Sequence, residues 1–406
     1  MRAPRLRTSD ERGLARQALA AAMLANTLAV LPVFLLGSLA VLVRRDLDFG
    51  EVRLGLAAAA FSAASALFSV FGGRLAQRVG AVRAMTLGVC GSAGALVGIA
   101  VLARSWLLLV VLLMIGGVGS AIAQPGTNLA LARAVPEARQ GLAYGIKQAS
   151  LPLATLTAGL AVPVVGQTVG WRWGFAGAAL VAVVFVVVVP KPSEPVQRHA
   201  SSGPRGGGAD TGTGPLLLLA AAATAAAASN NALGAFYVES AVSRGLSSGL
   251  AGFLLAAGGL SGITGRVLWG WQADRRDGRH LPRVAVLLLG GACGSLLLAY
   301  SSGRMVVLAA GTVLAFAAGW GWPGLFNFAV VRHNRSAPAA ATGITQTGVY
   351  VGAVIGPPGF GWLVEHVSYT SAWLAAAGAL IVAACLVTVG RRAVLTDVAR
   401  RGAGGE

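Results

Sequence analysis

The segments Gly145-Ile146-Lys147-Gln148 and Gly343-Ile344-Thr345-Gln346 each lie inside a long apolar stretch, one in each half of the chain. Pro125-Gly126 and Pro323-Gly324 repeat with the same spacing, so the two halves align in one register over two neighbouring stretches. This register predicts a duplicated chain whose halves have diverged. Lys147, one of two lysines among 32 basic residues, has Thr345 as its counterpart, so a charge is present in only one copy.

The composition indicates a membrane protein. Of the 406 residues, 56% are hydrophobic and 11% are charged, whereas soluble proteins have about 25% charged residues. The 57 glycines are typical of closely packed membrane helices. Cys90, Cys293 and Cys385 lie far apart in apolar stretches, which excludes a disulfide framework and a zinc spacing.

Twelve apolar stretches approach or exceed the roughly 20 residues that a helix needs to cross a bilayer. We therefore predict an all-α integral membrane protein with twelve transmembrane helices in two pseudo-symmetric six-helix bundles. The predicted spans are 17–43, 54–73, 82–103, 105–132, 140–166, 172–189, 215–238, 247–270, 282–302, 304–331, 339–363 and 370–390.

The distribution of basic residues predicts the topology. The net charge is +18, and most arginines fall in the loops on the side of the N-terminus, which the positive-inside rule places in the cytoplasm. We therefore expect a multi-pass protein of the cytoplasmic (plasma) membrane with both termini cytoplasmic, and no nucleic-acid partner. The predicted parts are an N-terminal tail (1–16), a first bundle (17–189), a flexible cytoplasmic linker (190–214), a second bundle (215–390) and a cytoplasmic C-terminal tail (391–406).

Two loops carry a shared motif, after the second span and after the eighth. They contain Gly73, Arg74, Gln77, Arg78, Gly80 and Arg83 in the first, and Gly270, Asp274, Arg275, Gly278 and Arg279 in the second. Both resemble the cytoplasmic loop motif of the major facilitator superfamily, roughly G-x-L-A-D-R-x-G-R. Ordinary positive-inside loops would explain the arginines but not this spacing of glycine and acid. We interpret the motif as a structural latch, weaker in the first copy, where Gln77 replaces the acid.

The resemblance covers the whole chain and implies a twelve-span secondary transporter. It implies a cavity between the halves, lined by the first, fourth, fifth, seventh, tenth and eleventh spans. The arginine that many proton-driven members carry in the fourth span is absent, because 116–120 reads Gly-Gly-Val-Gly-Ser. A glycine and proline pattern typical of drug antiporters is missing from the fifth span, although 356–359 in the eleventh reads Gly-Pro-Pro-Gly. No subfamily can be assigned from these patterns.

Lys147 is the main candidate for contact with a substrate. A charge near mid-membrane is costly unless it faces water or a partner. We interpret Lys147 as the only cation deep within a span, and no Asp or Glu lies equally deep, since Glu239 is near the end of the seventh span. A lone buried base favours an anionic solute. The alternative is a structural tie to backbone carbonyls, Gln148 or Glu239.

Further polar and aromatic residues lie within the spans expected to line the cavity. Asparagines there can serve as interhelical hydrogen bonds or bind ligand, and tryptophans can form a cavity wall or pack in the core. The remaining candidate substrate-binding residues are Gln148, Gln346, Thr345, Tyr350, Asn26, Asn230, Trp320 and Trp322.

We predict a transporter, secondary active or facilitative, that works by alternating access on a small organic anion, with or without a coupling ion. The alternative is an efflux pump for amphipathic drugs or secondary metabolites, and a receptor or assembly factor on the same fold is a third reading. All four histidines fall in loops or the linker and the spans lack paired acids, so we expect no enzyme, no cofactor and no metal. We expect a monomer in the lipid bilayer. Substrate identity, direction and coupling ion stay open.

Overall fold

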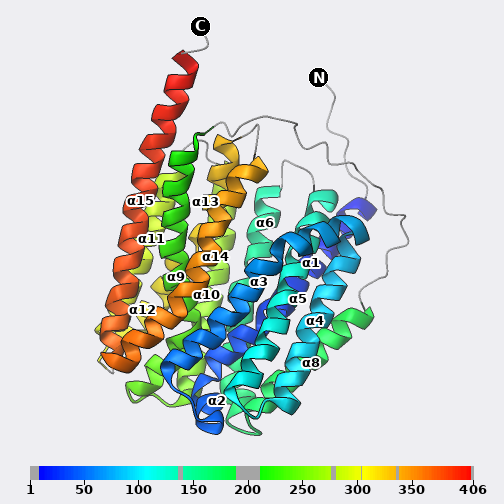
Figure 1. Ribbon diagram of the computed structural model, residues 1–406, viewed down its shortest axis with the longest axis vertical. Coiled ribbons are helices and arrows are strands. Elements are labelled where there is room, and N and C mark those ends of the chain that lie inside the picture. The colour runs from blue at the N-terminus through cyan, green and yellow to red at the C-terminus, as the bar shows by residue number, and fades with distance from the viewer. Residues whose placement is uncertain are drawn as a thin grey trace.

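The computed structural model describes residues 9–135, 140–188, 211–275, 280–302, 304–334 and 338–403. Within these ranges the chain is helical and has no strand (Figure 1). The helices are α1 (Ser9–Ser38), α2 (Ala40–Leu47), α3 (Glu51–Val79), α4 (Ala81–Leu102), α5 (Trp106–Ala134), α6 (Gln140–Gln148), α7 (Ser150–Ala161), η2 (Val162–Gly166), α8 (Trp171–Val188), α9 (Thr213–Ser243), α10 (Ser248–Arg275), α11 (His280–Ala299), α12 (Met305–Leu314), η3 (Ala315–Gly319), α13 (Trp322–His333), α14 (Pro338–His366) and α15 (Tyr369–Ala403).

The twelve predicted spans are confirmed in number and position. Twelve helical segments of the described chain are long and apolar enough to cross a membrane. The fifth span is built from α6, α7 and η2, and the tenth from α12, η3 and α13. The short α2 follows the first span, and α15 continues beyond the predicted boundary at residue 390 to Ala403.

The outward surface of the helices is apolar, as a bilayer requires. Side chains such as Leu67, Val187 and Val306 are more than three-quarters exposed, at 77%, 76% and 81%. Lipid tails are as apolar as these side chains, so the side chains need no covering by other helices. Helix association then depends on close packing of small residues rather than on burial of apolar area.

The helices form two groups that meet along a long seam. Figure 1 shows α1 to α8, which we call the N-half, on one side and α9 to α15, the C-half, on the other. Small residues let the halves approach closely: a Cβ at Gly159 would lie 2.6 Å from the backbone nitrogen of Ala256. The bundle limits given above remain predictions, and nearly all of the predicted linker lies outside the described residues.

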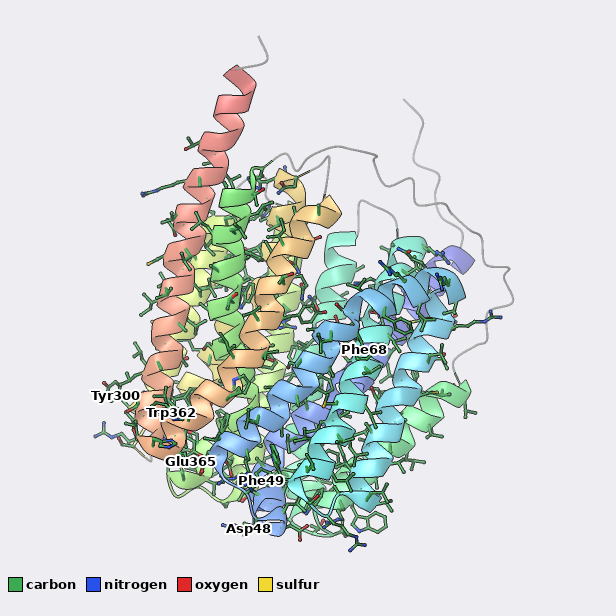
Figure 2. All side chains as sticks on the ribbon, viewed as in Figure 1. Asp48, Phe49, Phe68, Tyr300, Trp362 and Glu365 are labelled. Carbon is green, nitrogen blue, oxygen red and sulfur yellow. The ribbon has the colours of Figure 1, made fainter. Side chains whose placement is uncertain are left out.

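The first helix, α1, begins at the same end of the molecule at which the last helix, α15, ends. We call this the termini end, drawn at the top of Figure 1, and the opposite one the far end. Among the residues labelled in Figure 2, Asp48, Phe49 and Glu365 lie at the far end. An even number of spans requires this arrangement.

Candidate functional site

Two buried cations face each other across the seam. Lys147 on α6 and Arg266 on α10 are 4% and 5% exposed, and both lie within spans. Gly145, two residues before Lys147, lets α6 approach α10 closely, since a Cβ there would stand 3.5 Å from the Cα of Gly270. The two positive charges are near enough to repel each other.

The prediction that Lys147 is the only deep cation is therefore wrong. Arg266 lies near the end of the eighth span, where arginines of a positive-inside loop are expected, and sequence reasoning grouped it with them. The available signal was the run Val267-Leu268-Trp269-Gly270 after it, which shows that the apolar helix continues for a further turn. Because the helix continues within the membrane beyond this position, the Arg266 side chain has to point into the protein interior.

Arg266 is held by backbone carbonyls of both halves. Its Nε donates a hydrogen bond to the carbonyl of Trp320 at 2.8 Å, and its Nη1 donates to the carbonyl of Gln148. Trp320 follows η3, whose wider π turn changes the hydrogen-bonding register there. The guanidinium keeps its full charge, because carbonyl oxygens satisfy its donors without neutralising it.

Lys147 has no such partner. No hydrogen bond or ion pair connects its ammonium group to any residue of the described ranges, although the side chain is buried. Glu239, one of the predicted structural partners, instead pairs with Arg44. The site thus combines two positive charges from two halves with no described counter-charge.

Aromatic rings border the cation pair. The Trp320 ring lies 5.8 Å from the Arg266 guanidinium, within the range of a cation–π contact. It packs edge-on against Phe34 of α1, with ring centroids 5.7 Å apart, and its Nε1 donates to the carbonyl of Asn230 at 3.2 Å. Trp320 therefore ties α1, α9 and α10 together beside the two charges.

Asn26 and Ser150 form a hydrogen-bonded pair next to this site. Asn26 is fully buried on α1, and its Nδ2 donates to Ser150 Oγ, one turn along from Lys147. The Thr27 hydroxyl donates to the carbonyl of Ser150 at 3.3 Å. The Oδ1 of Asn26 has no donor. The asparagine thus makes the interhelical hydrogen bond that was one of its two predicted roles, with one acceptor still free.

The other predicted residues are distributed more widely. Thr345 is fully buried and its hydroxyl donates within its own helix, to the carbonyls of Ala341 and Thr342. Gln346 and Tyr350 are half-buried on α14. Trp322 packs against Phe326 in the core of the C-half, so the structure does not bring it to Trp320 as a shared wall.

The loop motif is only partly visible. Gly80 has a φ of 88° and connects α3 to α4, a conformation that favours glycine. The side chains at four positions of the first copy, Arg74, Gln77, Arg78 and Arg83, are exposed. Gly73 faces open space among the described residues, and the close approach to α5 is made by Gly72.

In the second copy, Gly270 lies on α10. Asp274 and Arg275 are the last helical residues, whose side chains are not described, and Gly278 and Arg279 lie outside the described residues. The predicted latch stays a prediction.

An open groove of about 720 Å³ lies away from these residues, on α11, α12 and η3. Its walls are apolar, from Leu297, Met305 and Val313 among others, and face outward like the rest of the lipid-exposed surface. It offers no polar group to orient a charged solute. The cation pair is the better candidate site.

Comparison with known proteins settles the family. A sequence model of the Major Facilitator Superfamily matches residues 22–303 and 216–403. The chain belongs to this superfamily. The predicted resemblance is thus confirmed, and with it the transporter class: a multi-pass membrane protein for a small-molecule substrate, not an enzyme.

Two curated proteins from Agrobacterium vitis are similar to this chain over most of its length. Both are named "Putative tartrate transporter". One is 26% identical over 388 residues, covering 87% of this chain and 85% of the relative, and the other is 25% identical over 390 residues, covering 87% and 88%.

Solved structures share the fold. A bacterial homologue of the human lysosomal transporter Spinster, inward-facing and occupied, has a TM-score of 0.74 at 17% identity and covers 96% of this chain and 99% of its own. A D-xylose–proton symporter has a TM-score of 0.71 at 16% identity, covering 92% and 97%. At these identities the likeness concerns the fold alone.

Proposed function

We propose that this chain is a secondary transporter that carries a small organic anion across the membrane by alternating access. The observation that carries the proposal is the pair Lys147 and Arg266, buried on facing helices of the two halves with no carboxylate among the described residues to neutralise them. Burying two positive charges within the membrane costs free energy, and a bound anion would offset this cost by pairing with both charges. A site shared between halves is also what alternating access needs.

Two cations favour a solute with two negative charges. Tartrate, after which the Agrobacterium vitis relatives are named, is a small acid with two carboxylates and two hydroxyls. The free Oδ1 of Asn26 would accept a hydrogen bond from a hydroxyl, and Ser150 lies on the same face as Lys147. We therefore propose a tartrate-like dicarboxylic acid as the substrate, with Gln148, Asn230, Thr345, Gln346 and Tyr350 as its further surroundings.

A drug exporter is the second candidate, supported by the aromatic group of Trp320, Phe316 and Phe34. Many amphipathic drugs are cations, however, and a second buried cation, Arg266, opposes them. The aromatic rings have a structural use in positioning Arg266. The anion is therefore the better-supported substrate class.

The orientation follows from the positive-inside rule. We propose that the termini end faces the cytoplasm across the plasma membrane, that the protein works as a monomer and that residues 190–214 serve as a slack connection between the halves.

Binding of tartrate to purified protein tests the proposal. Lys147→Gln removes one of the two charges but keeps a polar side chain at this position. It should weaken tartrate binding by about 10- to 100-fold, since one charge-assisted contact contributes roughly 1.5–3 kcal/mol. The matched control is Arg133→Gln at the end of α5, outside the loop motif, which removes an exposed charge that has no partner among the described residues and should leave binding unchanged. Equal binding of an anion by wild type and Lys147→Gln would contradict the proposal, and so would tight binding of cationic compounds to both.

A further inference from the structure

A charged cluster connects the two halves at the far end. Nη1 of Arg44, on α2 of the N-half, donates to both carboxylate oxygens of Glu239, on α9 of the C-half, at 2.7 and 2.6 Å. The same nitrogen lies 3.0 Å from Oε1 of Glu51 at the start of α3. Arg44 Nε is fixed by the carbonyl of Phe49 at 2.9 Å. One arginine thus joins a carboxylate of its own half to a carboxylate of the other.

Burial distinguishes this ion pair from an ordinary surface contact. The Glu239 side chain is 6% exposed and Arg44 is 18% exposed, whereas Arg172 and Asp46, a pair within the N-half, are 38% and 43% exposed. Water screens the Arg172–Asp46 pair and leaves its charges nearly independent. The Arg44–Glu239 pair has little such screening, so losing either charge leaves the other buried without its partner.

Among the described residues, the remaining far-end contacts between the halves do not depend on a buried charge. Glu365 of α14, labelled in Figure 2, is exposed and accepts a hydrogen bond from the Val52 backbone at 2.9 Å. Gly55 packs directly on the backbone of Pro357, and Gly361 on that of Glu51. These contacts hold the far ends of the two halves together, but they depend little on pH. The ion pair is the element of the seam that can switch.

Only the carboxylate of this pair can lose its charge. Burial alone would lower the pKa of Arg44, but the carboxylates of Glu239 and Glu51 more than reverse this, and the pKa of Arg44 ends above its ordinary value. Arginine therefore stays charged at any pH a cell meets. A proton on Glu239 would remove the attraction, and Arg44 would keep Glu51 as its partner within the N-half.

The groups facing Glu239 come from three elements. They are Arg44 from α2, Glu51 from α3 and the hydroxyl of Tyr369 from α15, which donates to Oε2 at 3.5 Å. On α14, His366 is engaged with the carbonyl of Trp362 and Glu365 with Val52. The described parts of α1 and α10 at this end carry no titratable side chain.

We propose that Glu239 is a proton-binding site and that the Arg44–Glu239 pair is a gate, so that a proton from the far-side solution releases Arg44 and lets the far ends of the two halves separate. The proposal rests on the proposed function, because alternating access requires these ends to part. It adds a coupling ion: the proton binds one carboxylate, no other bond is made or broken, and the proton leaves when the pair re-forms.

Distance measurement between spin labels tests the gate without any solute. Labels would be placed on cysteines at Leu102 and Tyr300, exposed uncharged residues at the far end of the N-half and the C-half, after Cys90, Cys293 and Cys385 are changed to serine. On lowering the pH from about 8 to about 5, across the range in which a buried carboxylate titrates, the wild type should shift toward a longer distance. Glu239→Gln should show the longer distance at both pH values, and Arg44→Gln should do the same.

Asp46→Asn is the matched control, because it removes an ion pair at the same end that joins α2 and α8 within one half. It should keep the wild-type pH response. A wild-type distance that does not change with pH would overturn the proposal, and so would a Glu239→Gln protein that stays closed at pH 8. Lys147→Gln should also keep the pH response, so failure of anion binding and failure of the gate give separate results.

Discussion

At the scale of single residues, Arg266 has two separate roles, one in packing and one in attracting an anion. Its hydrogen bond to the carbonyl of Gln148 crosses the seam to α6, and its hydrogen bond to the carbonyl of Trp320 fixes the segment after η3 within the C-half. Its charge, close to that of Lys147, favours an anion at the same place. The geometry of the guanidinium serves the first role, and the charge alone serves the second.

Substitutions at Arg266 separate the two roles. Arg266→Lys keeps the charge but cannot reach two carbonyls in a fixed fork, whereas Arg266→Gln loses the charge and leaves at least one carbonyl unsatisfied. We expect Arg266→Gln to lower the free energy of unfolding by about 1–3 kcal/mol and to abolish tartrate binding. Arg266→Lys should be destabilised by less and should retain weakened binding. Thermal unfolding and calorimetric titration in the same detergent check both; equal binding by the two variants would contradict the role of the charge.

The sequence predicts Lys147 because lysine is rare in the chain and the surrounding apolar segment is long. It does not predict Arg266, because an arginine near the end of a span is ambiguous until the fold shows it turned inward. Glu239 is recognisable as the carboxylate nearest to the membrane interior. Its partner Arg44 lies 195 residues away along the chain, so only the packing of α2 against α9 reveals the pair.

At the scale of elements, adjacent glycines on α3 differ in what they contact. A Cβ at Gly72 would meet the backbone of Ala121 on α5, whereas a Cβ at Gly73 would meet nothing among the described residues. Gly73 begins the loop motif, and Gly72 precedes it. Close approach of α3 to α5 thus depends on the residue outside the motif.

Alanine substitutions at this pair test the packing. Gly72→Ala forces a methyl group against backbone that cannot rotate away, so we expect a loss of about 1–3 kcal/mol in the free energy of unfolding. Gly73→Ala is the matched control at the next position, and the better helix propensity of alanine should make it neutral or stabilising by up to about 1 kcal/mol. Denaturation in detergent or bicelles would measure both. Comparable destabilisation by both substitutions would show that the α3–α5 contact is not as close as the structure has it.

Helix number and approximate bounds are predictable from sequence because the bilayer fixes the length of an apolar span. The breaks in regular α-helix within the spans are harder to predict from the sequence. The π segments Val162–Gly166 and Ala315–Gly319, and the short α2, depend on how neighbouring helices fit. Of these, η3 has the clearest consequence, since it precedes the Trp320 carbonyl that binds Arg266.

At the scale of the whole molecule, the repeat and its asymmetry have a common explanation. The duplicated halves supply a scaffold in which α6 and α10 meet, and the two cations come one from each half. The far ends are joined by Arg44 and Glu239, again one residue from each half. Movement of the halves relative to each other would therefore change both the anion site and the gate, which is how a bound solute and a proton could be coupled.

The most direct measurement of the central claim is counterflow of radiolabelled tartrate into liposomes containing the purified protein. With unlabelled tartrate inside, wild type and Arg133→Gln should accumulate label at the same rate, and Lys147→Gln, inserted to the same level, should not exceed protein-free liposomes. Uptake by Lys147→Gln at the wild-type rate would contradict the account. A wild type that fails to move tartrate or any other small dicarboxylate would contradict it as well.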